Sequence, residues 1–134
     1  MDNERLARWW AMFAGVALVV AGLLGFVGGN PIASADPNAL FQVNALHNII
    51  HIATGAIALW LGYTARGSAL STGLIAYGAL YAVVLVLLLV DPGLFGLFAD
   101  APANVFDHLL HAVLAVVSIG LGWMLRSASP AMAR

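Results

Sequence analysis

The sequence predicts an all-α integral membrane protein, a four-helix bundle. Hydrophobic residues make up 63% of the 134 residues and charged residues only 8%, whereas soluble domains have roughly 45–50% apolar residues. The apolar residues gather in four continuous runs, each near the roughly 20 residues that cross a bilayer. A backbone in lipid must satisfy its own hydrogen bonds, and the runs do not alternate as strands do. Each run is therefore expected to be a helix.

The predicted helices cover residues 9–27, 44–63, 70–90 and 104–125. Residues typical of turns lie between them: Gly28, Gly29, Asn30 and Pro31, then Gly67, then Asp91, Pro92 and Gly93. No Gly/Ser-rich linker divides the chain, so residues 1–134 are expected to form a single four-transmembrane-helix domain.

The first helix allows one alternative, because Arg5 and Arg8 precede an apolar run that ends before Ala33, Ser34 and Ala35, a pattern typical of a cleaved signal peptide. The run is longer than the roughly 7–15 residues of a signal core. We therefore expect the first helix to be retained.

Arginines predict the orientation, because cytoplasmic loops keep the positive charge. All five, Arg5, Arg8, Arg66, Arg126 and Arg134, fall on one side of the four spans, and the chain has no lysine. Four tryptophans lie near the same helix ends: Trp9, Trp10, Trp60 and Trp123. Both termini are therefore expected in the cytoplasm, and the opposite end of the bundle faces outward.

All four histidines lie in two short segments that open the second and fourth helices at the outward end: HNIIH, from His47 to His51, and DHLLH, from Asp107 to His111. His47 and His51 are four residues apart and share a helix face, as do Asp107 and His111. The two helices begin on the same side, so these pairs are expected to converge. They form a metal-ligand set suited to zinc, copper or iron.

Two further interpretations of the histidines stay open. His51 and His111 would be the axial ligands of a single b-type haem, whereas a purely structural hydrogen-bond network or a proton-sensing role would need no cofactor. Asn44, Asn48 and His108 are expected to flank the ligands and orient them.

Small residues continue both polar faces towards the cytoplasmic end. Below His51 they are Gly55, Ala58 and Gly62, and below His111 they are Ala115, Ser118 and Gly122. Such spacing lets membrane helices approach closely. The second and fourth helices are therefore expected to pack directly on each other, with the first helix outside this pair.

Several function classes lack support in the sequence. A net charge of −1 gives no basic surface for nucleic acid, and the absence of cysteine removes thiolate chemistry. The hydrolase elbow Gly-x-Ser-x-Gly and the phosphate-binding loop are absent from the sequence. No catalytic residue is assigned, and enzyme activity is not predicted.

The block LFQVNALHNIIH, residues 40–51, followed by Gly55, resembles a family of small bacterial four-span proteins known as domain of unknown function 4383. The resemblance covers most of the chain and implies a membrane protein of no established activity. It carries over to Asn44, His47, Asn48, His51, Asp107 and His111, whereas the family has asparagine at the position of His108.

The sequence therefore predicts a bacterial inner-membrane protein with a His/Asp metal or haem site at its outer, periplasmic face. The alternative is a non-catalytic accessory or assembly subunit of a larger membrane complex, or a homo-oligomer, in which the polar segments form a structural network. The lipid bilayer is the expected partner in either case.

Overall fold

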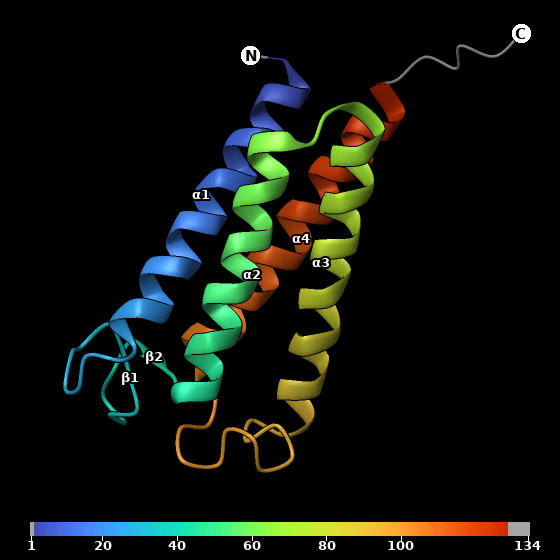
Figure 1. The fold of residues 1–134 in the computed structure, drawn as a ribbon. Helices are drawn as coiled ribbons and strands as arrows, with labels where there is room; N and C mark the ends of the chain where they lie inside the picture. The colour runs from blue at the N-terminus through green and yellow to red at the C-terminus, as the bar shows by residue number, and fades with distance from the viewer. Residues whose placement is uncertain (1, 129–134) are drawn as a thin grey trace, which may run out of the picture.

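The computed structural model describes residues 2–128, which form four long helices and one small pair of strands (Figure 1). The elements are α1 (Asn3–Leu24), β1 (Ala33–Ser34), β2 (Phe41–Gln42), α2 (Ala45–Thr64), α3 (Gly67–Val90) and α4 (Val105–Ala128). All four helices are long and apolar enough to span a membrane. The predicted all-α, four-span fold is confirmed, and the chain is a multi-pass membrane protein.

The helices begin and end near the predicted positions, with the largest difference at the start of α1. The apolar run begins at residue 9, but the helix begins at Asn3 because the Asp2 carboxylate caps it, accepting a hydrogen bond from the Arg5 amide at 2.7 Å. Hydropathy marks only the part of a helix that lies in lipid, so it misses the polar first turns.

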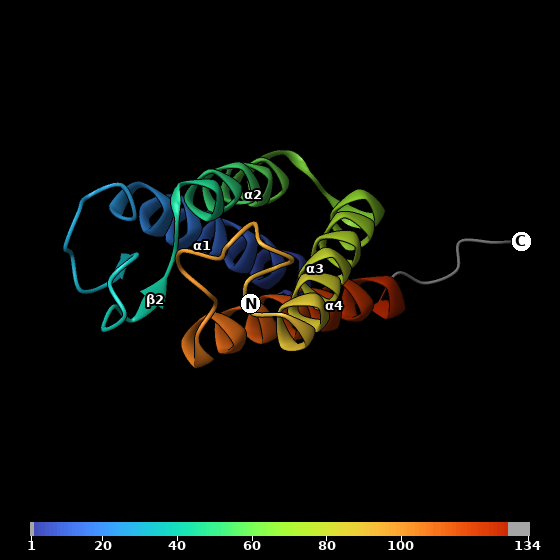
Figure 2. The ribbon, with the colours of Figure 1, turned by 90° about the horizontal axis from the view of Figure 1, so that it is seen from below.

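The helices associate in two close pairs, α1 with α2 and α3 with α4, as Figure 2 shows. The predicted direct packing of α2 on α4 is wrong. Gly55 of α2 faces α1, where an added methyl group would meet the Gly15 carbonyl oxygen at 2.8 Å, and Gly122 faces α3, where it would meet the Ser71 carbonyl oxygen at 2.8 Å. The glycine-containing face of α2 therefore packs on α1, and that of α4 packs on α3, instead of the two packing on each other as expected.

Between these pairs the contacts are uneven. The α1 and α4 helices approach along part of their length, and the Trp10 indole donates a hydrogen bond to Ser118 Oγ at 2.9 Å. The α2 and α3 helices approach much less, although only Ala65 and Arg66 connect them. The α2 and α4 helices lie at opposite corners of the bundle, and their histidines face each other across its centre.

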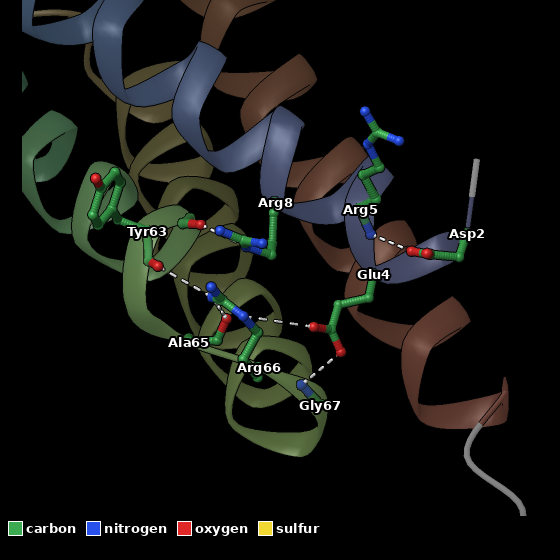
Figure 3. Close-up of polar contacts among 9 residues, drawn as sticks. Asp2, Glu4, Arg5, Arg8, Tyr63, Ala65, Arg66 and Gly67 are labelled. Atoms are coloured by element: carbon green, nitrogen blue, oxygen red, sulfur yellow. Dashed lines mark hydrogen bonds and ion pairs between the residues drawn. The ribbon is translucent and has the colours of Figure 1, made fainter.

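One end of the bundle gathers the N-terminal end of α1, the α2–α3 connection and the C-terminal end of α4 (Figure 1). Figure 3 shows its polar contacts: Arg8 Nε donates to the Gly62 carbonyl at 2.9 Å, and Glu4 accepts from the Gly67 amide at 3.0 Å. Arg66 lies 3.9 Å from the Glu4 carboxylate. Four of the five arginines therefore share one end, as predicted, and Arg134 lies outside the described residues.

The opposite end is built from the segments 25–44 and 91–104. In the first, β1 and β2 pair in parallel, with Ala33 opposite Phe41. The Asn30 side chain bridges this segment, donating to the carbonyls of Leu24 and Ala33 at 2.7 Å. The segment is a folded cap on the bundle, and the turn residues of the sequence do not predict it.

Candidate functional site: a buried histidine cluster

The first turns of α2 place two imidazoles in the interior. Asn44 caps the helix, because its Oδ1 accepts a hydrogen bond from the His47 amide at 2.9 Å. His47 and His51 lie one turn apart with ring centroids 4.3 Å from each other, and each is only 1% exposed. The predicted i,i+4 face therefore points into the bundle.

The third imidazole comes from α4 and completes what we call the histidine cluster: His47, His51 and His111. The ring centroid of His111 lies 6.0 Å from that of His47 and 6.3 Å from that of His51. Each ring offers one nitrogen such that the three nitrogens lie within 4.8 Å of one another. The predicted convergence of three imidazoles is thus present, although α2 and α4 do not pack together.

Four ring nitrogens of the cluster are buried without a hydrogen-bond partner among the described residues: Nδ1 and Nε2 of His47 and of His51. A buried polar atom without a partner costs about 1–3 kcal/mol, so such atoms are rare in folded proteins. Four such nitrogens on the adjacent rings of His47 and His51 indicate a site where another molecule or ion binds.

His111 differs from the other two, because its Nδ1 lies 2.6 Å from the Asp107 carbonyl oxygen. A carbonyl only accepts, so Nδ1 carries the proton in the neutral ring, and Nε2 is left with a free lone pair. This bond orients the ring and fixes the tautomer.

The Asp107 side chain does not join the three nitrogens. Its Oδ2 accepts hydrogen bonds from the Asn104 amide at 2.8 Å and from the Gln42 amide at 3.1 Å, while Asn104 Oδ1 accepts from the Asp107 amide at 3.0 Å. This reciprocal pattern is a capping box at the start of α4. Asp107 is 0% exposed, and its Oδ1 has no partner among the described residues.

The three residues expected to flank the ligands lie at different distances from the cluster. Asn44 holds the start of α2 and donates to Asp100 Oδ1 at 2.7 Å. Asn48 is buried and faces α1, where an added methyl group at Gly25 would collide with its amide. His108 is half-buried on α4, outside the group of three nitrogens.

Comparison with known proteins identifies the family. A family model described as "Domain of unknown function (DUF4383)" matches residues 8–124. The chain belongs to the DUF4383 family. Neither the curated proteins nor the solved structures contain a significant match to this chain. The resemblance carried by residues 40–51 is therefore confirmed, and this DUF4383 protein is a four-span membrane protein whose activity the family does not supply.

The Phe98 side chain covers the cluster of this DUF4383 protein. The Phe98 ring stacks on the His47 ring, with centroids 4.5 Å apart and planes 7° from parallel, and Phe98 is 2% exposed. The backbone turns sharply just before it, because Leu94 and Phe95 both have positive φ. The apolar stretch 94–98 predicts a lid or anchor at the outer end of the bundle, with Phe41, Phe95, Phe98 and Phe106 at the site entrance, but nothing in its composition indicates which of these rings covers the cluster.

Thr54 and Tyr81 form the floor of the cluster. The Tyr81 hydroxyl and Thr54 Oγ1 share a hydrogen bond of 2.7 Å between α3 and α2, and the Tyr81 ring lies 5.4 Å from that of His111. The position of Thr54, three residues after His51, was the available signal for its role.

A cavity of about 100 Å³, here the histidine cavity, adjoins the cluster on its α3 side. Its wall consists of the three histidines with residues of α2, α3 and the 91–104 segment: Ile50, Thr54, Leu80, Tyr81, Val84, Leu94 and Phe98. Apart from the imidazoles and two hydroxyl groups, the side chains of this wall are apolar. The cavity gives the cluster open space on one side.

Proposed function

We propose that this protein holds one transition-metal ion between His47, His51 and His111, at the end of the bundle opposite the arginines. The observation that carries the proposal is the set of four partnerless ring nitrogens in the cluster. A metal ion would accept the lone pair of one nitrogen in each ring, and the group of possible ligands among the described residues contains no carboxylate.

The distances suit a small ion. A point equidistant from three atoms 4.8 Å apart lies about 2.8 Å from each, whereas zinc–imidazole bonds are about 2.0–2.1 Å. Ring movements of less than about 1 Å would therefore close the coordination shell. Three imidazoles leave one position open, as in catalytic rather than structural zinc sites, and the same donors suit copper and iron.

The contact between His111 and the Asp107 carbonyl supports ligation through Nε2. Ligating histidines usually donate their second N–H to a carbonyl or carboxylate, which fixes the ring and strengthens its free nitrogen as a ligand. His111 already has this arrangement at 2.6 Å. Asp107 then positions a ligand through its backbone, while its carboxylate holds the start of α4.

The available space favours an ion over a haem. Pockets that hold drug-sized molecules measure about 300–1,000 Å³, whereas the histidine cavity measures about 100 Å³. The His51 and His111 rings would have to receive a porphyrin between them, but the His47 ring lies 4.3 Å from one and 6.0 Å from the other. We therefore propose a metal ion without a porphyrin.

The positive-inside rule assigns the arginine end to the cytoplasm, which supports a metal site on the periplasmic side of a bacterial inner membrane.

The accessory-subunit alternative has less support. Its structural network would use side-chain hydrogen bonds, and neither ring nitrogen of His51 has a partner among the described residues. Its docking faces would use glycines such as Gly55 and Gly122, which already pack within the chain.

Metal analysis of the detergent-purified protein, together with its absorption spectrum, tests the proposal. We expect about one equivalent of metal in wild type and none in the His51→Ala/His111→Ala double variant, with no Soret band in either. His108→Ala is the matched control, because it removes a histidine outside the cluster, and it should keep the metal. Metal-free wild type that also fails to bind added zinc, copper(I) or iron(II) would overturn the proposal, as would metal retained by the double variant.

A further inference from the structure

The histidine cavity connects the cluster to the lipid-facing side of the bundle. Its wall includes Ile50 on α2 and Leu80 on α3, which are 38% and 48% exposed. These two helices are the adjacent pair that approach each other least closely. The cavity therefore opens sideways, between α2 and α3.

The opening lies at the depth of the bilayer hydrocarbon. Val84 and Leu80 lie six and ten residues before the end of α3 at Val90, which places them about 9 and 15 Å from that end. The neighbouring exposed side chains are apolar, among them Val83 at 58% and Val86 at 59% exposure. The opening is therefore expected to border lipid chains rather than water or headgroups.

The route from the outer aqueous side is covered. Phe98 lies over His47 and packs against Leu88 and Ala103, all of them buried. A molecule that approaches from water would have to displace this aromatic cover, whereas one dissolved in the bilayer meets only the gap between α2 and α3.

We propose that the open side of the cluster receives a small, uncharged, lipid-soluble molecule of diatomic size, such as dioxygen or nitric oxide, which enters from the bilayer between α2 and α3. This inference rests on the proposed metal ion, to which the molecule would bind. The cavity has about three times the roughly 30 Å³ volume share of a water molecule. A charged or strongly hydrated ligand would lose its hydration without gaining partners from the apolar wall.

Two matched pairs of variants test the route. Val84→Phe and Ile50→Phe place an aromatic ring in the wall of the cavity. Val83→Phe and Ile49→Phe are the controls, since they make the same substitutions one residue away, at exposed positions outside the cavity. Two independent positions keep the test valid if one variant folds poorly. Metal content and thermal unfolding of each variant are measured first.

Carbon monoxide binding to the copper(I)-loaded protein is the main measurement, followed by its infrared stretch, with xenon NMR of metal-free protein as a second probe of the cavity. We expect Val84→Phe and Ile50→Phe to weaken or slow carbon monoxide binding about tenfold and to reduce xenon binding, at unchanged copper content. The two controls should match wild type. Azide, a hydrated anion, should bind much more weakly than carbon monoxide.

The possible failures are distinguishable. If wild type binds no copper(I), zinc or iron(II), the metal proposal fails, and this inference fails with it. If copper(I) binds but carbon monoxide does not, if both cavity variants bind carbon monoxide like wild type, or if azide binds as readily, then the metal proposal stands and the lipid-side route is overturned.

Discussion

Replacing His51 by leucine should stabilise the metal-free protein. Both ring nitrogens of His51 are buried without partners, and each costs about 1–3 kcal/mol. Leucine has a volume similar to that of histidine, so repacking around it should reduce the gain in the free energy of unfolding by only about 1 kcal/mol. Polar groups of the unfolded chain also find partners in a micelle, which reduces the gain. We therefore expect the free energy of unfolding to rise by about 1–2 kcal/mol.

Metal should reverse this order of stability. An ion present at a hundred times its dissociation constant stabilises the folded wild type by about 2.7 kcal/mol, and the leucine variant should gain little. The assay is reversible unfolding by sodium dodecyl sulfate in mixed micelles, followed by circular dichroism, with chelator and then with metal. His111→Leu is the comparison, and its gain should be smaller because Nδ1 of His111 already has a partner at 2.6 Å.

The reasoning would be refuted if metal-free His51→Leu were less stable than wild type by about 1 kcal/mol or more. The imidazole would then contribute to the fold through hydrogen bonds, as the structural-network interpretation requires.

Three further predictions concern the surroundings of the cluster. Gly55→Ala should lower the free energy of unfolding by about 1–2 kcal/mol, because its methyl group would lie 2.8 Å from a backbone oxygen of α1, whereas Gly120→Ala, with nothing within 4 Å, should not lower it; detergent unfolding compares the two. Asp107→Asn should change the metal dissociation constant less than about threefold, because the carboxylate caps α4 rather than binding the ion. A fall in metal affinity of more than about tenfold in a chelator competition would instead identify Asp107 as a ligand. Phe98→Ala should release metal to a chelator about tenfold faster and cost about 3–5 kcal/mol, because it uncovers His47 and leaves a cavity; an unchanged release rate would contradict its role as a cover.

The four spans could be predicted because lipid leaves the backbone few choices. A run of apolar residues near 20 long must form its hydrogen bonds internally, so hydropathy alone gives the helices. The spacing of His47 and His51 likewise fixes a shared face, and an even number of crossings places His111 at the same end. These inferences depend only on helix periodicity and on the number of membrane crossings, and both follow directly from the order of residues.

The partner of each helix could not be predicted in the same way. The stripe of Gly55 and Gly62 indicates that some backbone approaches α2 closely, but the same spacing suits any neighbour. The partner proved to be α1, although a 20-residue segment separates it from α2, and the helix joined to α2 by two residues packs against it loosely. The small residues therefore indicate a close helix contact, but they do not identify the helix that makes it.

The side chains that complete the site lie where sequence patterns carry least information. Phe98 reaches His47 because of a turn in which Leu94 and Phe95 adopt positive φ, a conformation that residue preferences disfavour. Asp107 shares the helix face of His111, as predicted, but two backbone amides already donate hydrogen bonds to its carboxylate at the start of α4. Spacing identifies which residues share a face, and it does not identify which of them the backbone already uses.

The helix pairing and the cluster have a common physical origin. Glycine faces bring α1 to α2 and α3 to α4 closely enough for backbone contact, and a bundle assembled from two tight pairs has looser contacts between them. The larger side chains of His47, His51, His111 and Tyr81 lie in that looser space, where there is room for imidazoles and a cavity. Direct packing of α2 on α4 would have removed this room. The same arrangement that contradicts the predicted helix contact therefore makes the predicted meeting of the three histidines possible.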